Sequence, residues 1–177
     1  KNGSYDCFTI SGLDFDNALI EETPQHWNIP KQKYTKLLQF IHFIISSNLG
    51  HPYGWKTQQD GCLVSDVLPI SGYEEYQQGF GSVGGLRFHT EDPFHVARAD
   101  FFTLMCMRNL DNTPTTLFPL DLTTIPEEIK DELFKEQFQI IPDESHTELT
   151  YTNGINEDNS EVFKEFNIVR TISILYG

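Results

Sequence analysis

The stretch that decides the fold reads Leu86-Arg87-Phe88-His89-Thr90-Glu91-Asp92-Pro93-Phe94-His95. Its first residues favour a β-strand, and side chains alternate between the two faces of a strand. We therefore expect His89 and Glu91 to project to one side and Thr90 to the other. An imidazole nitrogen and a carboxylate oxygen on one side supply two of the three ligands of a 2-His-1-carboxylate facial triad, which suits non-haem Fe(II). The motif indicates an oxygenase.

A bare His-x-Glu pattern is weak, and its surroundings strengthen it here. Residues 79–85 form a glycine-rich loop that allows close approach, and Asp92-Pro93 ends the expected strand just past the carboxylate. The loop is not a phosphate-binding loop, because no Lys-Ser/Thr pair follows and a strand comes next. His95 is a competing ligand, but it lies beyond Pro93, so we expect it to have a structural role.

Length, composition and charge limit the class of protein. The chain has 177 residues, of which 38% are hydrophobic and 13% aromatic. We expect one globular catalytic domain over residues 1–177. The net charge of −14 and the absence of any Lys/Arg cluster argue against a nucleic-acid partner. The same charge mildly favours cationic small molecules, although an acidic surface more often serves solubility alone.

Cysteine usage and hydropathy bear on the compartment. The chain has three widely spaced cysteines, Cys7, Cys62 and Cys106, and no C-x-x-C motif. This pattern argues against disulfide scaffolds and zinc knuckles and favours a reducing compartment. The sequence contains no apolar run of membrane-spanning length, and residues 1–10 lack a signal-peptide core. We expect a cytoplasmic protein without a membrane partner.

The pattern along the chain predicts an α+β fold that is mainly β. Apolar residues at helical spacing predict a helix over 31–48 that is stopped by Gly50, and a second helix over 125–134 capped by Thr124. The polar segment 143–161 is a candidate lid. Strands are expected at 6–10, 61–69, 86–91, 100–108 and 161–176, the fourth of them buried.

A longer block carries a family resemblance. It runs from Thr57-Gln58-Gln59-Asp60-Gly61 through Val67-Leu68-Pro69 to His89-Thr90-Glu91-Asp92-Pro93-Phe94-His95 and Arg98-Ala99-Asp100. This block resembles the clavaminate synthase-like branch of the Fe(II)/2-oxoglutarate dioxygenases, and within it the hydroxylases of free amino acids such as arginine, asparagine, enduracididine and lysine. Supporting phrases at 10–13, 23–27, 104–109 and 141–146 extend the likeness over nearly the whole chain. The resemblance implies a double-stranded β-helix (jelly roll) core with flanking helices.

The resemblance also implies roles for particular residues. His89 and Glu91 would be the first two iron ligands. A threonine about twenty-seven residues after the first histidine would bind a carboxylate of 2-oxoglutarate, and this spacing falls on Thr115-Thr116, with Thr116 preferred. A glutamine that contacts the amino-acid head group of the substrate would be Gln58, or else Gln59. The glycine-rich loop around Ser82 would hold the same end of the substrate.

One departure from the family pattern is large. The third iron ligand of the family is a histidine far downstream, followed by an arginine that pairs with 2-oxoglutarate, and neither has a counterpart in these 177 residues. His146 falls where the family has no ligand. We therefore expect the chain to lack the C-terminal part of its jelly roll.

The leading hypothesis is Fe(II)/2-oxoglutarate- and O2-dependent hydroxylation of an unactivated carbon of a free L-amino acid. Lysine or arginine is the preferred substrate, and asparagine-like or cyclic guanidino amino acids remain open. Glu91 argues against a halogenase, since related halogenases lack that carboxylate. One alternative is a non-catalytic jelly-roll module that binds a metal or a small ligand. A zinc hydrolase is a weaker alternative, since no H-E-x-x-H spacing is present. The pattern makes no prediction of oligomeric state.

Overall fold

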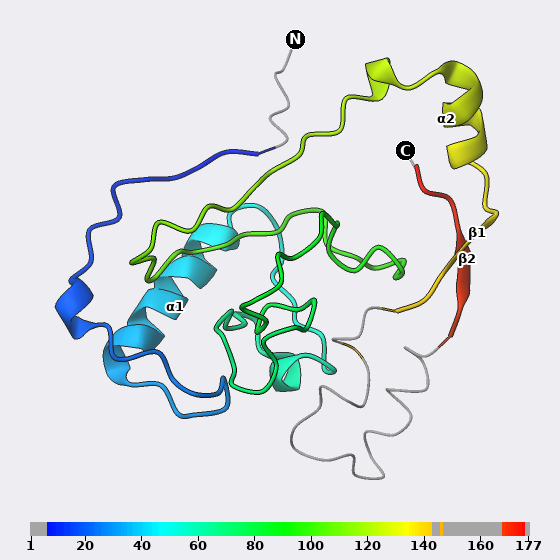
Figure 1. The fold of residues 1–177 in the computed structure, drawn as a ribbon. Coiled ribbons are helices and arrows are strands. Elements are labelled where there is room, and N and C mark those ends of the chain that lie inside the picture. The colour runs from blue at the N-terminus through cyan, green and yellow to red at the C-terminus, as the bar shows by residue number, and fades with distance from the viewer. Residues whose placement is uncertain (1–6, 143–145, 147–167, 176–177) are drawn as a thin grey trace.

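The computed structural model describes residues 7–142, 146 and 168–175. Within these residues the chain forms two α-helices, short 3-10 turns and one two-stranded sheet, joined by long irregular segments (Figure 1). The elements are, in chain order, η1 (Asn17–Leu19), α1 (Lys33–Ser46), η2 (Gln59–Gly61), η3 (Leu122–Thr124), α2 (Glu127–Leu133), β1 (Phe138–Ile140) and β2 (Arg170–Ile172).

Helix α1 confirms the first predicted helix and corrects its end. Leu38 lies on its buried face and is 2% exposed. The last carbonyls of the helix are satisfied by side chains: Ser47 Oγ and Asn48 Nδ2 both donate to Ile44 O at 2.8 Å. The predicted stop at Gly50 is wrong, because this glycine does not adopt the positive φ of a glycine cap.

Helix α2 confirms the second predicted helix, but not its predicted cap. Glu127 and Glu128 occupy the first turn, where carboxylates interact favourably with the helix dipole. Pro126 takes the N-cap position, and Thr124 instead ends η3. The proline leaves no room for a threonine cap next to the helix, so the hydroxyl of Thr124 bonds back to Asp121 O at 2.8 Å.

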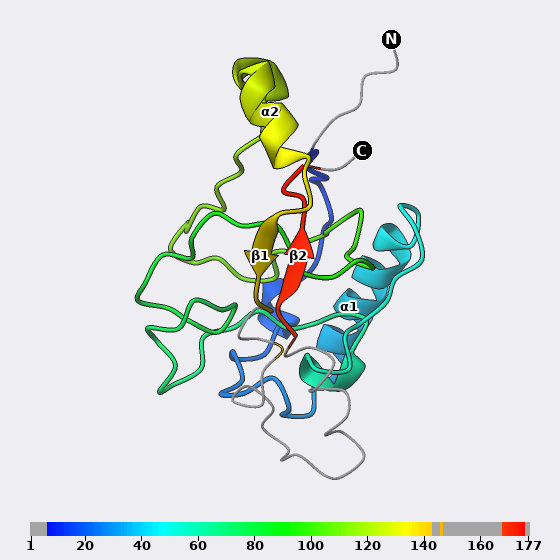
Figure 2. The same cartoon turned by 90° about the vertical axis from the view of Figure 1, so that its right-hand side faces the viewer.

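Strands β1 and β2 pair antiparallel and are fastened to α2. Phe138 pairs with Ile172 and Ile140 with Arg170. Past β2, the backbone amides of residues 174 and 175 donate to Leu133 O at 2.9 and 3.0 Å. Figure 2 shows the two strands side by side below α2, with α1 at another side of the molecule.

The other predicted strands are not formed in the described residues. Segments 61–69, 86–91 and 100–108 are irregular, as are the described residues of 6–10, and of 161–176 only β2 is a described strand. The predicted burial of 100–108 is wrong at Phe101, Phe102 and Leu104, which are 60%, 64% and 54% exposed. Strand-forming residues give a strand only where a second strand supplies the ladder of hydrogen bonds. In the described residues these segments have no such partner, and the jelly roll stays a prediction.

The buried residues gather around the irregular middle of the chain. The buried apolar side chains are Leu38, Leu68, Ile70 and Phe94, and the buried polar ones are Thr57, Gln78 and His146. The candidate lid at 143–161 lies outside the described residues, except for His146. Within the described ranges, none of the helices is both long and apolar enough to cross a membrane.

Candidate metal centre

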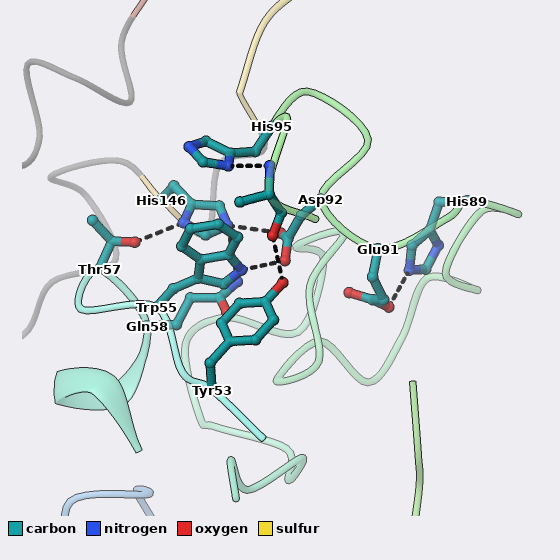
Figure 3. A network of polar contacts seen from close by, with 10 residues as sticks. Tyr53, Trp55, Thr57, Gln58, His89, Glu91, Asp92, His95 and His146 are labelled. Carbon is teal, nitrogen blue, oxygen red and sulfur yellow. Dashed lines mark hydrogen bonds and ion pairs between the residues drawn. The ribbon is translucent and has the colours of Figure 1, made fainter. Parts of the chain in front are cut away.

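The structure brings His89 and Glu91 together on one side of their segment. His89 Nε2 lies 3.2 Å from Glu91 Oε1, although the segment is irregular rather than a strand (Figure 3). Two ligands that each lie about 2.1 Å from an ion and at right angles to one another are about 3 Å apart. The pair therefore fits two adjacent coordination positions of one cation.

A second contact of His89 sets its tautomer for metal binding. His89 Nδ1 lies 2.6 Å from Arg87 O, and a carbonyl oxygen only accepts hydrogen bonds. The proton of the neutral ring is therefore on Nδ1, and the lone pair is on Nε2, the atom next to Glu91. Histidines that bind metals commonly donate their other ring N–H to a backbone carbonyl in this way.

The pair is accessible from solvent. The side chains of His89 and Glu91 are 45% and 43% exposed, so an ion and its other ligands can reach both. Within the part of the chain that the structure describes, no group of three or more His, Cys, Asp or Glu side chains has the geometry of a complete metal site. His89 and Glu91 are thus candidates for part of a metal site.

Asp92, directly after Glu91, has an unusual backbone conformation that its side chain stabilises. Its φ is +46°, in the left-handed region, which costs a residue with a Cβ about 1 kcal/mol. Trp55 Nε1 donates to Asp92 Oδ2, and His146 Nε2 lies 2.8 Å from Asp92 Oδ1. These two contacts hold the backbone turn that follows the carboxylate of Glu91.

His146 is the centre of a buried network that we call the His146 anchor, made of Trp55, Thr57, Asp92 and His146. The ring of His146 is completely buried, and its Nδ1 lies 2.6 Å from the hydroxyl of Thr57, which is 2% exposed. The rings of Trp55 and Phe94 stand edge-on to it, with centroids at 5.7 and 5.1 Å. Figure 3 shows His146 and Trp55 on one side of Asp92 and Glu91 and His89 on the other.

The two candidate glutamines have different partners. Gln58 Nε2 lies 3.2 Å from His146 Nε2 (Figure 3). The amide of Gln59 is bound to the backbone of Asp66, from which it accepts at 2.9 Å and to which it donates at 2.8 Å. Of the two, Gln58 lies at the anchor, so it is the better candidate for the head-group contact.

Several hydrogen bonds hold the backbone of the glycine-rich loop, and two of them share one carbonyl. The backbone amides of Ser82 and Val83 both donate to Glu74 O at 3.0 Å, and the side chain of Ser82 is exposed. At Gly81 a Cβ would lie 2.1 Å from Tyr76 O, so no other residue fits this turn. The loop thus presents Ser82 on a fixed backbone.

Thr115 and Thr116 are exposed residues of an irregular segment. Phe118, two residues after Thr116, packs against Phe88, the residue before His89, with ring centroids 5.9 Å apart. The threonine segment therefore approaches the segment that carries His89 and Glu91, the candidate metal-ligand pair. A role in 2-oxoglutarate binding stays a prediction.

His95 is part of the aromatic packing next to the anchor. Its Nδ1 accepts from Ala97 N at 3.0 Å, and its ring stands edge-on to Trp55 at 4.7 Å. Tyr53 OH donates to Ala97 O at 2.9 Å, and burial, with the negative charges of Asp92 and Asp100, raises the pKa of Tyr53. These contacts agree with the structural role expected of His95.

The sequence pattern missed most of the anchor. Trp55 lies outside every motif, and Thr57 and Asp92 lie in the block that carries the family resemblance but were given no role at the site. His146 lies in a phrase that supported the family resemblance, yet its burial had no local signal. A histidine between polar residues would ordinarily be exposed.

Comparison with known proteins completes the description of the site. No family model matches the chain. It is 41% identical over 141 residues to an enduracididine beta-hydroxylase of Streptomyces hygroscopicus and 39% identical over 138 residues to an L-ornithine/L-arginine 3-hydroxylase of Catenulispora acidiphila. Each match covers 77% of this chain and 40% of the relative, so the chain spans less than half the length of these relatives.

Solved structures that resemble this chain also include a non-heme iron oxygenase. The crystal structure of the non-heme iron oxygenase OrfP with Fe, succinate and (3S)-hydroxy-L-Arg matches with a TM-score of 0.83 and 38% identity, over 94% of this chain and 51% of that one. OrfP has also been solved with Fe and alpha-ketoglutaric acid, and that structure matches with a TM-score of 0.75. These findings confirm the resemblance seen in the sequence. Over the part that it shares with them, the chain is similar to amino acid hydroxylases and to a non-heme iron oxygenase.

Proposed function

We propose that the protein hydroxylates an unactivated carbon of a free L-amino acid in a reaction that depends on Fe(II), 2-oxoglutarate and O2. The convergence of His89 Nε2 and Glu91 Oε1 at 3.2 Å carries this proposal. It is supported by the likeness to hydroxylases of arginine, ornithine and enduracididine and to OrfP, which binds Fe and alpha-ketoglutaric acid.

His89 and Glu91 would hold the iron. The carbonyl of Arg87 keeps the proton of the neutral imidazole on Nδ1, so Nε2 is the ligand atom, and Glu91 adds a negative charge that partly neutralises the cation. Bound with 2-oxoglutarate, Fe(II) supplies the activation of O2 that oxidises a C–H bond, with succinate and CO2 as co-products.

Thr116, or its neighbour Thr115, would donate to a carboxylate of 2-oxoglutarate. The packing of Phe118 on Phe88 supports this assignment, because it draws the threonine segment towards His89. Gln58 and Ser82 would bind the head group of the substrate, which fixes the position of one C–H bond relative to the iron. Gln58 is supported by its place at the anchor, and Ser82 by its fixed backbone.

The preferred substrate is a basic amino acid, arginine or lysine. Relatives include an L-ornithine/L-arginine 3-hydroxylase and an L-lysine 4-hydroxylase of Niastella koreensis, the latter 28% identical over 98% of this chain and 44% of its own length. The net charge of −14 agrees, since it attracts a cationic side chain.

The wider context of the site is part of the proposal. Residues 1–177 would belong to one catalytic domain with a jelly-roll core, which the TM-score of 0.83 to OrfP supports. A cytoplasmic location is supported by the three cysteines, which are exposed and free in the structure. We propose no nucleic-acid or membrane partner.

A spectroscopic titration of the whole protein tests the function. Anaerobic Fe(II) and 2-oxoglutarate should give the weak visible metal-to-ligand charge-transfer band, and His89→Ala should abolish it. His51→Ala, at an exposed histidine outside the site, is the matched control and should keep the band. Addition of O2 and of each of the twenty amino acids should then release succinate most strongly with arginine or lysine.

Two results would contradict the proposal. Absence of the band in the unmodified protein, together with an unchanged metal affinity in His89→Ala, would exclude the iron site. Metal binding without substrate-dependent succinate release would favour a non-catalytic metal-binding module.

A further inference from the structure

His146 is the most completely buried titratable side chain of the described residues, and the proposed function gives it no role. Its ring atoms contact three places: Thr57 Oγ1 at 2.6 Å, Asp92 Oδ1 at 2.8 Å and Gln58 Nε2 at 3.2 Å. Gln58 is the candidate for binding the head group of the substrate, and Asp92 directly follows Glu91, a candidate metal ligand. His146 thus lies between the two halves of the proposed site.

The chemistry of its partners fixes the protons of His146. Asp92 accepts only, so His146 Nε2 carries a hydrogen and donates to it. Nδ1 then accepts from the hydroxyl of Thr57 in the neutral ring. The two contacts use both ring nitrogens and hold the ring at both ends.

Matching donors with acceptors in the same way also indicates how the amide of Gln58 is oriented. Its Nε2 is a donor and so cannot bond to a protonated His146 Nε2 at 3.2 Å. A half-turn of the amide, which preserves its shape, would place Oε1 in that position, where it would share the Nε2 hydrogen with Asp92. In that orientation His146 would direct Oε1 of Gln58 towards the anchor and its NH2 group away from it.

We propose that His146 is a positioning residue, an inference that rests on the proposed function. Through Asp92, His146 holds Glu91 in place for the metal. It also orients Gln58 for the substrate head group. Asp92 transmits the first effect, because its left-handed backbone, at φ +46°, sets the direction of the chain next to Glu91. Without the bonds from His146 and Trp55, this turn would relax towards ordinary φ values and carry the carboxylate with it.

Two variants separate the contacts of His146. In His146→Gln the amide nitrogen reaches the place of Nε2 and keeps the bond to Asp92. In His146→Asn the amide reaches only the place of Nδ1, so the bond to Thr57 remains and the bond to Asp92 is lost. Both variants keep a polar side chain in the same buried site, which makes each a control for the stability of the other.

Co(II) binding by the whole protein, followed by its d–d absorbance, is the first readout. We expect His146→Asn to bind Co(II) at least tenfold more weakly than the unmodified protein, as for other groups that orient metal ligands, and His146→Gln to stay within about threefold. The affinity for L-arginine with Co(II) and 2-oxoglutarate bound should fall in the same order. The midpoints of thermal unfolding of the two variants should be similar.

Equal Co(II) affinities in the two variants would overturn the positioning role, as would losses that simply follow their unfolding temperatures. If the unmodified protein binds no Co(II), the proposed function fails, and NMR of the metal-free protein then decides the role of His146. The amide signals of Glu91 and Asp92 should move in His146→Asn and stay in His146→Gln. Signals that move alike in both variants would refute the proposal.

Discussion

The metal-ligand pair and the His146 anchor are neighbours with opposite surroundings. His89 and Glu91 are 45% and 43% exposed, whereas the ring of His146 is 0% exposed and Thr57 only 2%. A ligand needs access for the ion and its other ligands, and a polar group that must keep one geometry is better shielded from water. We infer from this comparison that the exposed residues would bind the ion and that the buried ones would hold them in place.

The largest effect on stability should come from Phe94, an apolar residue that packs against the anchor. Phe94 is 2% exposed and packs on His146, so Phe94→Ala should lower the free energy of unfolding by about 3–5 kcal/mol in urea titrations. Phe88→Ala is the matched control, since Phe88 is 70% exposed, and it should cost less than about 1 kcal/mol. Similar losses in the two variants would show that burial does not distinguish the regions.

The metal-ligand pair should respond in the opposite way. Glu91→Gln keeps the shape of the side chain and removes its charge, so Co(II) affinity should fall on the order of 100-fold while unfolding changes by less than about 0.5 kcal/mol. Isothermal titration calorimetry and urea denaturation measure the two quantities. Glu75→Gln, at an exposed carboxylate, should change neither. A large loss of stability in Glu91→Gln would contradict the separation of binding from support.

The polar part of the anchor can be weakened without a cavity. Thr57→Val replaces the hydroxyl by a methyl group and leaves Nδ1 of the buried His146 without the bond at 2.6 Å. The free energy of unfolding should fall by about 1–2 kcal/mol, the cost of an unsatisfied buried polar group. Thr57→Ser keeps the hydroxyl and should recover most of this loss in the same thermal melts; if it does not, packing rather than the bond is responsible.

The smallest effect lies on α1, outside both regions, and depends on pH. Burial lowers the pKa of His42 below 6.5, so the unfolded chain binds a proton more readily than the folded one. The stability that the folded chain gains from a neutral His42 is therefore complete above pH 6.5. It is lost as the pH falls below that value. Urea titrations at pH 7.5 and 5.5 should show a slightly smaller pH effect in His42→Gln than in the unmodified protein. His51→Gln, at an exposed site, should leave the pH effect unchanged.

Local sequence patterns predicted the features that depend only on residues close together in the chain. The apolar spacing in 31–48 located α1, and the acidic start after Pro126 located α2. The pairing of His89 with Glu91 involves residues two apart, so their spacing alone was enough to suggest it.

The remainder depends on contacts between distant residues. The segment 100–108 has the composition of a buried strand, yet the described residues give it no partner strand, and Phe102 is 64% exposed. The anchor joins Thr57 and Asp92 to His146, and no periodicity in the sequence reports that a threonine and a histidine so far apart will meet. Sequence reasoning therefore found the candidate ligands and missed what holds them.

The span of the anchor also has a consequence for the order of folding. Thr57 and His146 are 89 residues apart, so a ribosome adding about 5–20 residues per second needs roughly 4 to 18 s to pass from one to the other. The metal-ligand pair is synthesised before the end of that interval, while the polar groups of Trp55, Thr57 and Asp92 are still hydrated. The nascent chain thus has both candidate ligands before His146 has been made, and the contacts of the anchor can form only after residue 146 has been added.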